Sequence, residues 1–242
     1  MFDTQMTISE IVQSDYRTAD VFRSYNINYC CSGRISLEEA CKIKGIDTET
    51  ILHDIEGATR NINLPNNLDF ASWNIDFLID YIINVHHGYL KLALPQLELR
   101  LVSFATGHAK KYPELLIIQD TFMKLLPLLH SHNLHEEEVI FPYIKQIYIA
   151  NRRKESYANL FVKTLRKPLD NIDMEHSKIS KLLERLKTDT NNYTFPEKAC
   201  TNHQVLYHKL KELHTDMDQH KHLEKNLLFP KAIAIEMELL QL

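Results

Sequence analysis

Apolar residues recur along most of this chain at the spacing of an α-helix. The first long run after residue 70 places them at Ile75, Leu78, Ile79, Ile82 and Ile83, and then at Leu90, Leu94, Leu97 and Leu101. Intervals of three and four residues put such side chains on one face of a helix. Similar runs cover roughly residues 113–140, 168–188 and 200–228, and no segment alternates like a strand. Four long amphipathic helices predict an up-down four-helix bundle over residues 70–242.

The first 62 residues predict a smaller helical domain. Thr7 and Ser36 are each followed three residues later by a glutamate, which is the pattern of a capping box at a helix start. The polar stretch 61–67 contains a proline and no apolar period, so we place the domain boundary there. The sequence therefore predicts an all-α protein, with a small helical domain at 1–62 and the bundle at 70–242.

The motif His-x3-Glu-x4-Phe-Pro occurs twice in the predicted bundle. The first copy contains His132 and Glu136, and the second contains His220 and Glu224. Residues four apart lie on one face of a helix, with Cβ atoms about 5–6 Å apart. An imidazole and a carboxylate placed in this way can bind one metal ion together, and imidazole suits iron, copper, zinc and nickel. The repeat therefore predicts metal binding.

Each long helix offers a histidine at a matching level. The four are His87, His132, His176 and His220, at intervals of 45, 44 and 44 residues. In an up-down bundle of equal helices, such intervals return the chain to a similar height, so all four imidazoles can face one cavity. Two metal ions about 3.5–4 Å apart are commonly bridged by shared oxygens. Glu136 and Glu224 are the candidate bridges, and open positions would remain for a small ligand such as O2 or NO.

Two further histidines remain candidate metal ligands. His86 has apolar neighbours at helical spacing, so periodicity alone slightly favours it over His87. His108 lies 21 residues after His87, about 31 Å along a continuous helix, and could join the site only if the chain folded back.

The prolines at 95, 127, 142 and 230 are expected to kink or end their helices.

Composition places the chain among ordinary globular proteins. Of its 242 residues, 25% are charged and 44% hydrophobic, and the formal net charge is −4. Such a balance does not indicate a nucleic-acid or membrane surface. No apolar stretch approaches the roughly 18 residues of a membrane span, and no signal peptide is visible. We therefore expect a soluble, cytoplasmic protein in which Cys30 and Cys31, in a predicted turn, remain free thiols.

These residues resemble a known family. The turn Asn26-Ile-Asn-Tyr-Cys30-Cys31-Ser-Gly33, followed by a His/Glu bundle, is similar to the repair-of-iron-centres proteins, the ScdA/YtfE type, which have a hemerythrin-like bundle. The resemblance covers nearly the whole chain. It favours His87 over His86 as the first ligand, and the usual family turn has Gly where this chain has Ser32. It also implies a histidine where His108 stands, whose role stays open.

The resemblance implies a function and a cofactor. The bundle of this family holds two non-haem iron ions in an oxo-bridged di-iron centre, which implies the ligands His87, His132, Glu136, His176, His220 and Glu224. The family repairs iron–sulfur clusters damaged by oxidative or nitrosative stress, so damaged iron–sulfur proteins are the expected partners. The implied protein is a cytoplasmic homodimer that donates iron, with Cys30 and Cys31 as the thiols of iron transfer. Glu175 is a candidate for guiding iron or protons.

Two other functions belong to different classes. An enzyme could reduce nitric oxide at the open metal positions, or a hemerythrin-like carrier or sensor could bind O2 or NO reversibly. The cysteine domain argues against a simple carrier, which does not need one. A helical bundle used only as an interaction module would not explain two copies of the ligand motif.

Overall fold

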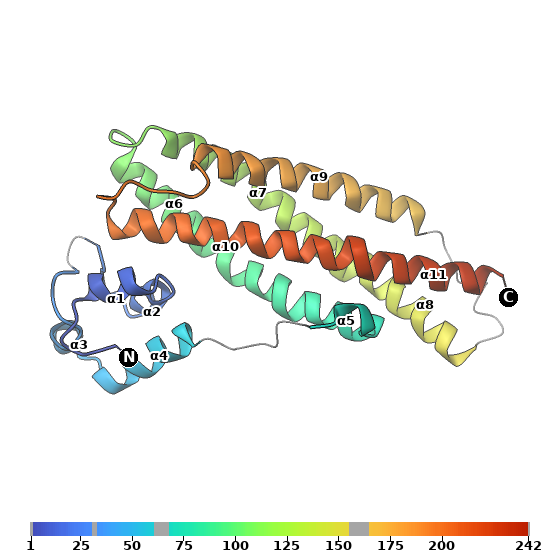
Figure 1. The fold of residues 1–242 in the computed structure, drawn as a ribbon, viewed down its shortest axis with the longest axis horizontal. Coiled ribbons are helices and arrows are strands. Elements are labelled where there is room, and N and C mark those ends of the chain that lie inside the picture. Colours follow the sequence, from blue (N-terminus) through green and yellow to red (C-terminus); the bar gives the residue numbers. More distant parts are fainter. Residues whose placement is uncertain (1, 31–32, 61–67, 155–164, 242) are drawn as a thin grey trace. The chain divides into compact units, whose positions relative to one another are not determined.

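Helices make up the described part of the chain. The computed structural model describes all residues except 1, 31–32, 61–67, 155–164 and 242 (Figure 1). Within those described residues, the only β-type pairing is an isolated bridge between Thr7 and Ser36. The predicted all-α fold is therefore confirmed. The predicted connector at 61–67 lies outside the described residues, as do Cys31 and Ser32.

The chain divides into two compact units. The smaller contains Met1–Asn66 together with Tyr193–Leu210, and the larger contains Asn67–Asn192 together with Lys211–Leu242. The helical pattern of the sequence predicts residues 193–210 as part of the bundle. Their place in the smaller unit follows from packing, because Val205 is buried in that unit's apolar core.

Four short helices form most of the smaller unit. They are α1 (Ile8–Ser14), α2 (Thr18–Ser24), α3 (Leu37–Lys44) and α4 (Thr48–Thr59). The Thr7 side chain accepts from the backbone of Glu10, and the Glu10 carboxylate accepts from the backbone of Thr7, which completes the predicted capping box. Ser36 accepts from the backbone of Glu39 in the same way at the start of α3. These caps satisfy amide groups that short helices would otherwise leave unpaired.

The larger unit contains the predicted bundle, built from four long helical segments. The first joins α5 (Ile75–Tyr81), η2 (Ile82–His87) and α6 (Gly88–His108), after the short η1 (Phe70–Ser72); the second joins α7 (Glu114–His135), η3 (Glu136–Ile140) and α8 (Phe141–Arg153). The third is α9 (Arg166–Asp189), and the fourth joins α10 (Thr201–Leu223), η5 (Glu224–Leu228) and α11 (Phe229–Leu240). Of α10, the larger unit contains the part from Lys211 onward. Helix α7 packs against α6 and α9, while α8 packs against α5 and α11.

The prolines do not end these helices. Pro95 and Pro127 lie inside α6 and α7, and the two Phe–Pro pairs open α8 and α11. Each of those pairs follows a π turn, η3 or η5, and η2 is a π turn as well. A proline lacks the N–H of the ordinary helical hydrogen bond and crowds the carbonyl four residues before it, and a wider turn accommodates both defects. The helices are therefore longer than the sequence analysis predicted.

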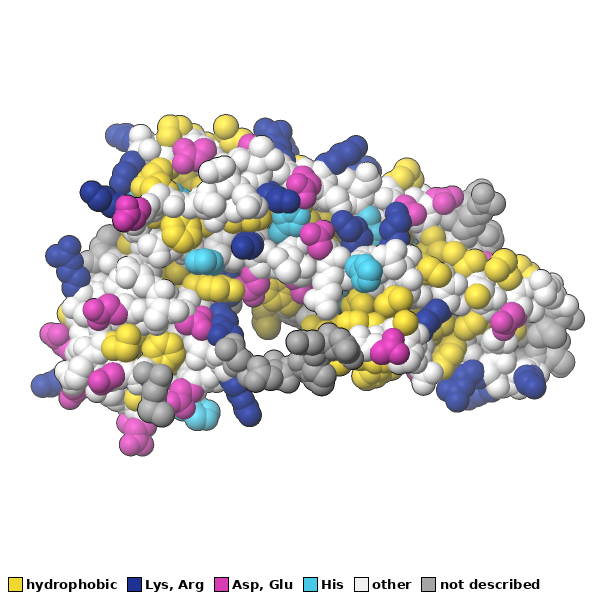
Figure 2. Space-filling view, in the orientation of Figure 1, with side chains coloured by type: hydrophobic (Ala, Val, Ile, Leu, Met, Phe, Trp, Pro, Cys, Tyr) yellow, Lys and Arg dark blue, Asp and Glu magenta, His cyan; other side chains and the backbone are white. Residues whose placement is uncertain are grey.

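The surface carries charges of both signs. On the face drawn in Figure 2, Lys and Arg side chains are interspersed with Asp and Glu, and neither sign gathers into one large patch. Among the helices that the structure describes, we find none with the length and apolar character needed to cross a membrane.

The backbone at Gly33 lies too close to its neighbours to admit a side chain there. A Cβ atom added there would lie 2.3 Å from the Tyr29 carbonyl oxygen and 3.2 Å from the Ser9 Cβ atom. Gly33 also donates its N–H to the Cys30 carbonyl and accepts from the backbone N–H of Ser9. Glycine is therefore required at this position by close packing.

Gly33→Ala should destabilise the smaller unit by about 1–3 kcal/mol, because backbone atoms must move to admit the methyl group. Urea unfolding, with hydrogen exchange of the α1 amides to locate the effect, would measure it. Gly57→Ala in α4 is the matched control: its added Cβ meets no atom within 4 Å. That control should gain roughly 0.5–1 kcal/mol from helix propensity. Equal stability of Gly33→Ala and the unsubstituted protein would contradict the close packing.

Candidate metal centre

Six ionisable side chains from the four long helical segments meet in the interior of the bundle. Each segment contributes one histidine, and two segments add a glutamate four residues further on. The six are His87, His132, Glu136, His176, His220 and Glu224. None of them is more than 4% exposed. Burial of this many ionisable groups is unfavourable unless they are paired or bind metal.

The π turns lie at these residues. His87 is the last residue of η2, while Glu136 and Glu224 are the first residues of η3 and η5. The motif spacing of four residues keeps each of these glutamates beside the histidine that precedes it. The π turn that begins at the glutamate makes room for the proline, which has no N–H and would crowd the carbonyl of an α turn. Single-turn π segments are frequent at functional sites, and here they coincide with three of the six side chains.

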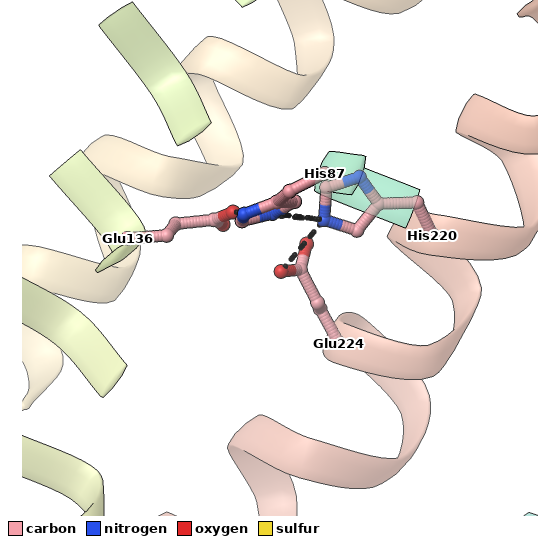
Figure 3. Close-up of side chains that lie close together, drawn as sticks. All are labelled: His87, Glu136, His220 and Glu224. Carbon is pink, nitrogen blue, oxygen red and sulfur yellow. Dashed lines mark hydrogen bonds and ion pairs between the residues drawn. The ribbon is translucent and has the colours of Figure 1, made fainter. Parts of the chain in front are cut away.

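The first group of four contains His87, Glu136, His220 and Glu224, whose candidate ligand atoms all lie within 4.8 Å of one another. The Nε2 atoms of His87 and His220 are 3.4 Å apart. Oε2 of Glu136 lies 3.3 Å from His87 Nε2 and 3.6 Å from His220 Nε2. Oε1 of Glu224 is 3.0 Å from His220 Nε2. Figure 3 shows these side chains pointing toward one another, with His220 and Glu224 from one segment and Glu136 from another.

The second group contains His132, Glu136, His176 and Glu224, again within 4.8 Å. Its two histidines present Nε2 atoms 3.1 Å apart. The carboxylates now use their other oxygens: Glu136 Oε1 lies 3.3 Å from His132 Nε2, and Glu224 Oε2 lies 3.1 Å from His176 Nε2. Each glutamate therefore turns one oxygen toward each pair of histidines.

This arrangement fits two metal ions. Both oxygens of Glu136 and Oε2 of Glu224 are buried without a hydrogen-bond partner among the described residues. Leaving buried carboxylate oxygens unpaired is costly. Two imidazole nitrogens and one oxygen from each carboxylate surround each of two positions, and carboxylates that share oxygens in this way commonly bridge metal pairs.

Two carboxylates that are not among the six side chains of the centre fix the orientation of two of its imidazole rings. Glu137 Oε1 lies 2.8 Å from His87 Nδ1, and Lys91 binds the same carboxylate at 3.0 Å. Glu175 Oε2 lies 2.9 Å from His132 Nδ1. A carboxylate at Nδ1 places the proton there and leaves the Nε2 lone pair free for a metal. Glu175 was a sequence candidate, whereas Glu137 was missed, and its place directly after Glu136 was the only signal for it.

The buried carboxylates control the charge of the imidazoles when no metal is bound. Burial by itself would lower the pKa of His220, but Glu224 and Glu136 outweigh burial and raise that pKa to about 10. Burial opposes the charge on Glu224 as well, yet His220, His176 and His132 hold its pKa well below the usual range. His220 is therefore protonated at neutral pH in the metal-free protein, and its stabilising contribution is lost only as the pH rises toward 10.

The structure also places the two histidines that the sequence left open. His86 is buried, but its Nδ1 faces Asp216 Oδ1 at 2.9 Å, and it belongs to neither group. A π turn contains one more residue than an α turn, so the face that carries Ile82 continues at His87 instead of His86. His108, the last residue of α6, lies beside the Phe104 carbonyl at 3.2 Å and belongs to neither group.

The cysteine turn belongs to the smaller unit. Cys30 is partly exposed, and its backbone N–H donates to Asn28 Oδ1 at 2.9 Å. Ser9 connects this turn to the start of α10: its N–H donates to the Gly33 carbonyl, and its Oγ lies 3.0 Å from Thr201 Oγ1. Cys200 is partly exposed directly before Thr201.

Comparison with known proteins matches both parts of the chain. The hemerythrin HHE cation-binding domain matches residues 78–232, and ScdA_N, described as a domain of unknown function, matches residues 4–59. The iron-sulfur cluster repair protein YtfE of Shigella boydii serotype 4 (strain Sb227) is 32% identical over 233 residues, which are 95% of this chain and 97% of the relative. The YtfE protein of Escherichia coli O157:H7 gives the same values.

Glu137→Gln should weaken metal binding about 10- to 100-fold, because the charged acceptor at His87 Nδ1 is lost. Competition with a chromophoric chelator would measure the affinity. Glu138→Gln is the matched control, since Glu138 is the next residue and is exposed. Similar losses in both variants would show that the effect is one of general charge and would refute the orienting role of Glu137.

Metal binding at pH 7 should release protons, because His220 must lose the proton that Glu224 and Glu136 stabilise. Affinity should accordingly rise with pH. A pH-stat titration of metal-free protein with Zn²⁺ would count the protons, and at least about one per chain is expected. His220→Ala should release fewer. Binding without proton release would contradict the protonated state of His220.

Proposed function

Because the chain belongs to the hemerythrin-like family of the iron–sulfur cluster repair proteins, we propose that it repairs iron–sulfur clusters damaged by oxidative or nitrosative stress. Family models match residues 4–59 and 78–232 of the chain, and its relatives named YtfE are covered almost end to end. In this proposal the bundle holds two non-haem iron ions and donates iron to damaged clusters.

One observation carries the proposal: each buried glutamate presents separate oxygens to two histidine pairs. His87 and His220 would hold one iron, His132 and His176 the other, and Glu136 and Glu224 would bridge them. Imidazole and carboxylate together suit iron, and each ion receives four protein ligands from this set. A structural zinc site would instead fill a closed tetrahedron from ligands of its own, commonly including thiolates.

The protein's own groups bind and orient the iron. Glu137 and Glu175 keep the Nε2 atoms of His87 and His132 turned inward, and burial excludes bulk water from the six side chains. The bound iron serves as a labile store of the element that a damaged cluster has lost. Cys30 is our proposed transfer thiol with Cys31, its neighbour in the sequence, because thiolates are soft ligands that hold iron in cluster proteins.

Location and assembly follow from the same proposal. We place the protein in the cytoplasm, where damaged iron–sulfur proteins are its partners and thiols stay reduced. Homodimer formation is also part of the proposal, and exposed leucines on the outer side of α6, including Leu92 and Leu99, supply apolar surface for it.

Reduction of nitric oxide at the metal pair is the second candidate function, with reversible NO or O2 binding as its simpler form. A cavity of about 520 Å³ between α6 and α7 favours it. Its lining is mostly apolar and includes Leu90 and Leu94, and it reaches Glu137, which holds His87. Small uncharged gases dissolve in such a cavity more readily than ions do.

Purified protein should contain about two iron ions per chain and restore activity to a damaged [4Fe–4S] enzyme in vitro. Glu136→Ala and Glu224→Ala should lose most of the iron, as measured by elemental analysis, because each removes ligands from both positions.

Anaerobic N2O production, abolished by the same two variants, would support the second function instead. Iron-loaded protein that cannot reactivate the enzyme would refute the repair function.

The Cys30→Ser/Cys31→Ser double variant should keep its iron and lose repair, since the thiols lie outside the six side chains of the centre. Cys41→Ala is the thiol control, because Cys41 is buried in the core of the smaller unit. Full repair by the double variant would exclude the thiols from iron transfer.

A further inference from the structure

A continuous line of aromatic rings runs through the larger unit to His220. The rings of Trp73 and Tyr81 lie 5.3 Å apart at 74°, and those of Tyr81 and His86 lie 5.6 Å apart at 73°. His86 then stacks on His220, at 5.6 Å and an angle of 14°. Centroid separations of 4.5–7 Å correspond to rings in contact. No aliphatic side chain or gap therefore interrupts the line between Trp73 and His220.

The outer end of this line lies at the surface. Trp73 is the only tryptophan of the chain and is half-buried. Phe77, with its ring centroid 4.7 Å away, is 54% exposed. The inner end, His220, is fully buried in the candidate metal centre. The line thus spans the distance between surface and centre.

Packing alone does not explain His86 in this line. The side chain is 1% exposed, and its Nε2 has no hydrogen-bond partner among the described residues. Leaving a buried nitrogen without a hydrogen bond is unfavourable, whereas a leucine or phenylalanine would fill similar space without that cost. His86 also binds no metal in the two groups of ligands described above. Its flat contact with His220 is the feature that an aliphatic side chain would not provide.

Asp216 adds a negative charge beside the line. Its Oδ1 is 2.9 Å from His86 Nδ1. Burial and the Asp216 charge both raise the pKa of Tyr81. A nearby negative charge also stabilises a ring that has given up an electron, by the same Coulomb attraction. The two middle rings therefore stand in a field that favours electron loss.

We propose that Trp73, Tyr81 and His86 form the route by which single electrons pass from a soluble one-electron carrier to the metal centre. This inference rests on the proposed di-iron function and deepens it. One electron leaves the reduced carrier and one ferric ion becomes ferrous, without a bond being made or broken, and a counter-ion from solvent balances the charge. Ferrous iron carries less charge than ferric iron and is attracted less strongly to the carboxylate ligands, so reduction makes the iron available for donation.

The test uses iron-loaded full-length protein and anaerobic reduced methyl viologen, a one-electron donor, in a stopped-flow instrument. Because the six ligands are buried, electrons must pass through protein. Trp73→Leu and Tyr81→Leu should each slow loss of the ferric absorption roughly tenfold, whereas Tyr81→Phe, which keeps the ring, should not. Phe70→Leu is the matched control: Phe70 touches Trp73 and Tyr81 but lies beside the line.

A second measurement uses the single tryptophan as a reporter. Hydrogen peroxide, a two-electron oxidant, should oxidise Trp73 in iron-loaded protein, because the oxidised centre draws electrons along the line. Mass spectrometry should find that oxidation lost in zinc-loaded protein, which undergoes no redox change, and in Tyr81→Leu. Equal Trp73 oxidation with zinc, or unchanged reduction rates in both leucine variants, would overturn the route.

Failure of this route can be told apart from failure of the proposed function. Iron content is measured in every variant before the kinetics, and repair is assayed with protein that dithionite has already reduced. Trp73→Leu should then hold normal iron and repair normally. Loss of repair by pre-reduced Trp73→Leu would overturn an electron-transfer role for Trp73, and absent iron in the unsubstituted protein would refute the di-iron function itself.

Discussion

The structure depends on two carboxylates that are buried where no water can solvate them. Glu136 and Glu224 are fully buried, and their oxygens face four imidazoles. Without cations beside them, such groups would cost several kcal/mol each. Protonated imidazoles balance part of this charge in the metal-free protein, and metal ions can replace those protons. The folded bundle is therefore stable only when protons or metal ions supply positive charge at the centre. Folding and metal binding are linked for this reason.

The same constraint accounts for the irregularities of the helices. An ordinary helix that carried a proline six residues after a buried glutamate ligand would break or kink inside the core. The π turns η3 and η5 keep each long segment continuous across its Phe–Pro pair, while the glutamate at the start of the turn stays beside its histidine. Lengths of the helices, and the depth at which the ligands lie, both depend on these turns.

Much of this could be predicted from the sequence, and the failures have a common cause. Apolar spacing predicted the all-α bundle, and the repeated motif with evenly spaced histidines singled out the six side chains that the structure brings together. Periodicity slightly favoured His86 over His87, and it was wrong because an α-helical period misplaces residues after a π turn. Glu137 was missed since its role depends on a contact with His87 from another helix, and no local pattern encodes that contact.

Under the proposed function, a centre deep in the core must both hold iron and release it, and these two requirements oppose each other. Burial and the Nδ1 partners of His87 and His132 favour tight binding. In that proposal, donation would need a change in the metal itself instead of an open path to solvent, and reduction from ferric to ferrous iron would be such a change. The rings from Trp73 to His220 connect the surface to the centre without widening it. Electrons can then control release while the six ligands remain enclosed.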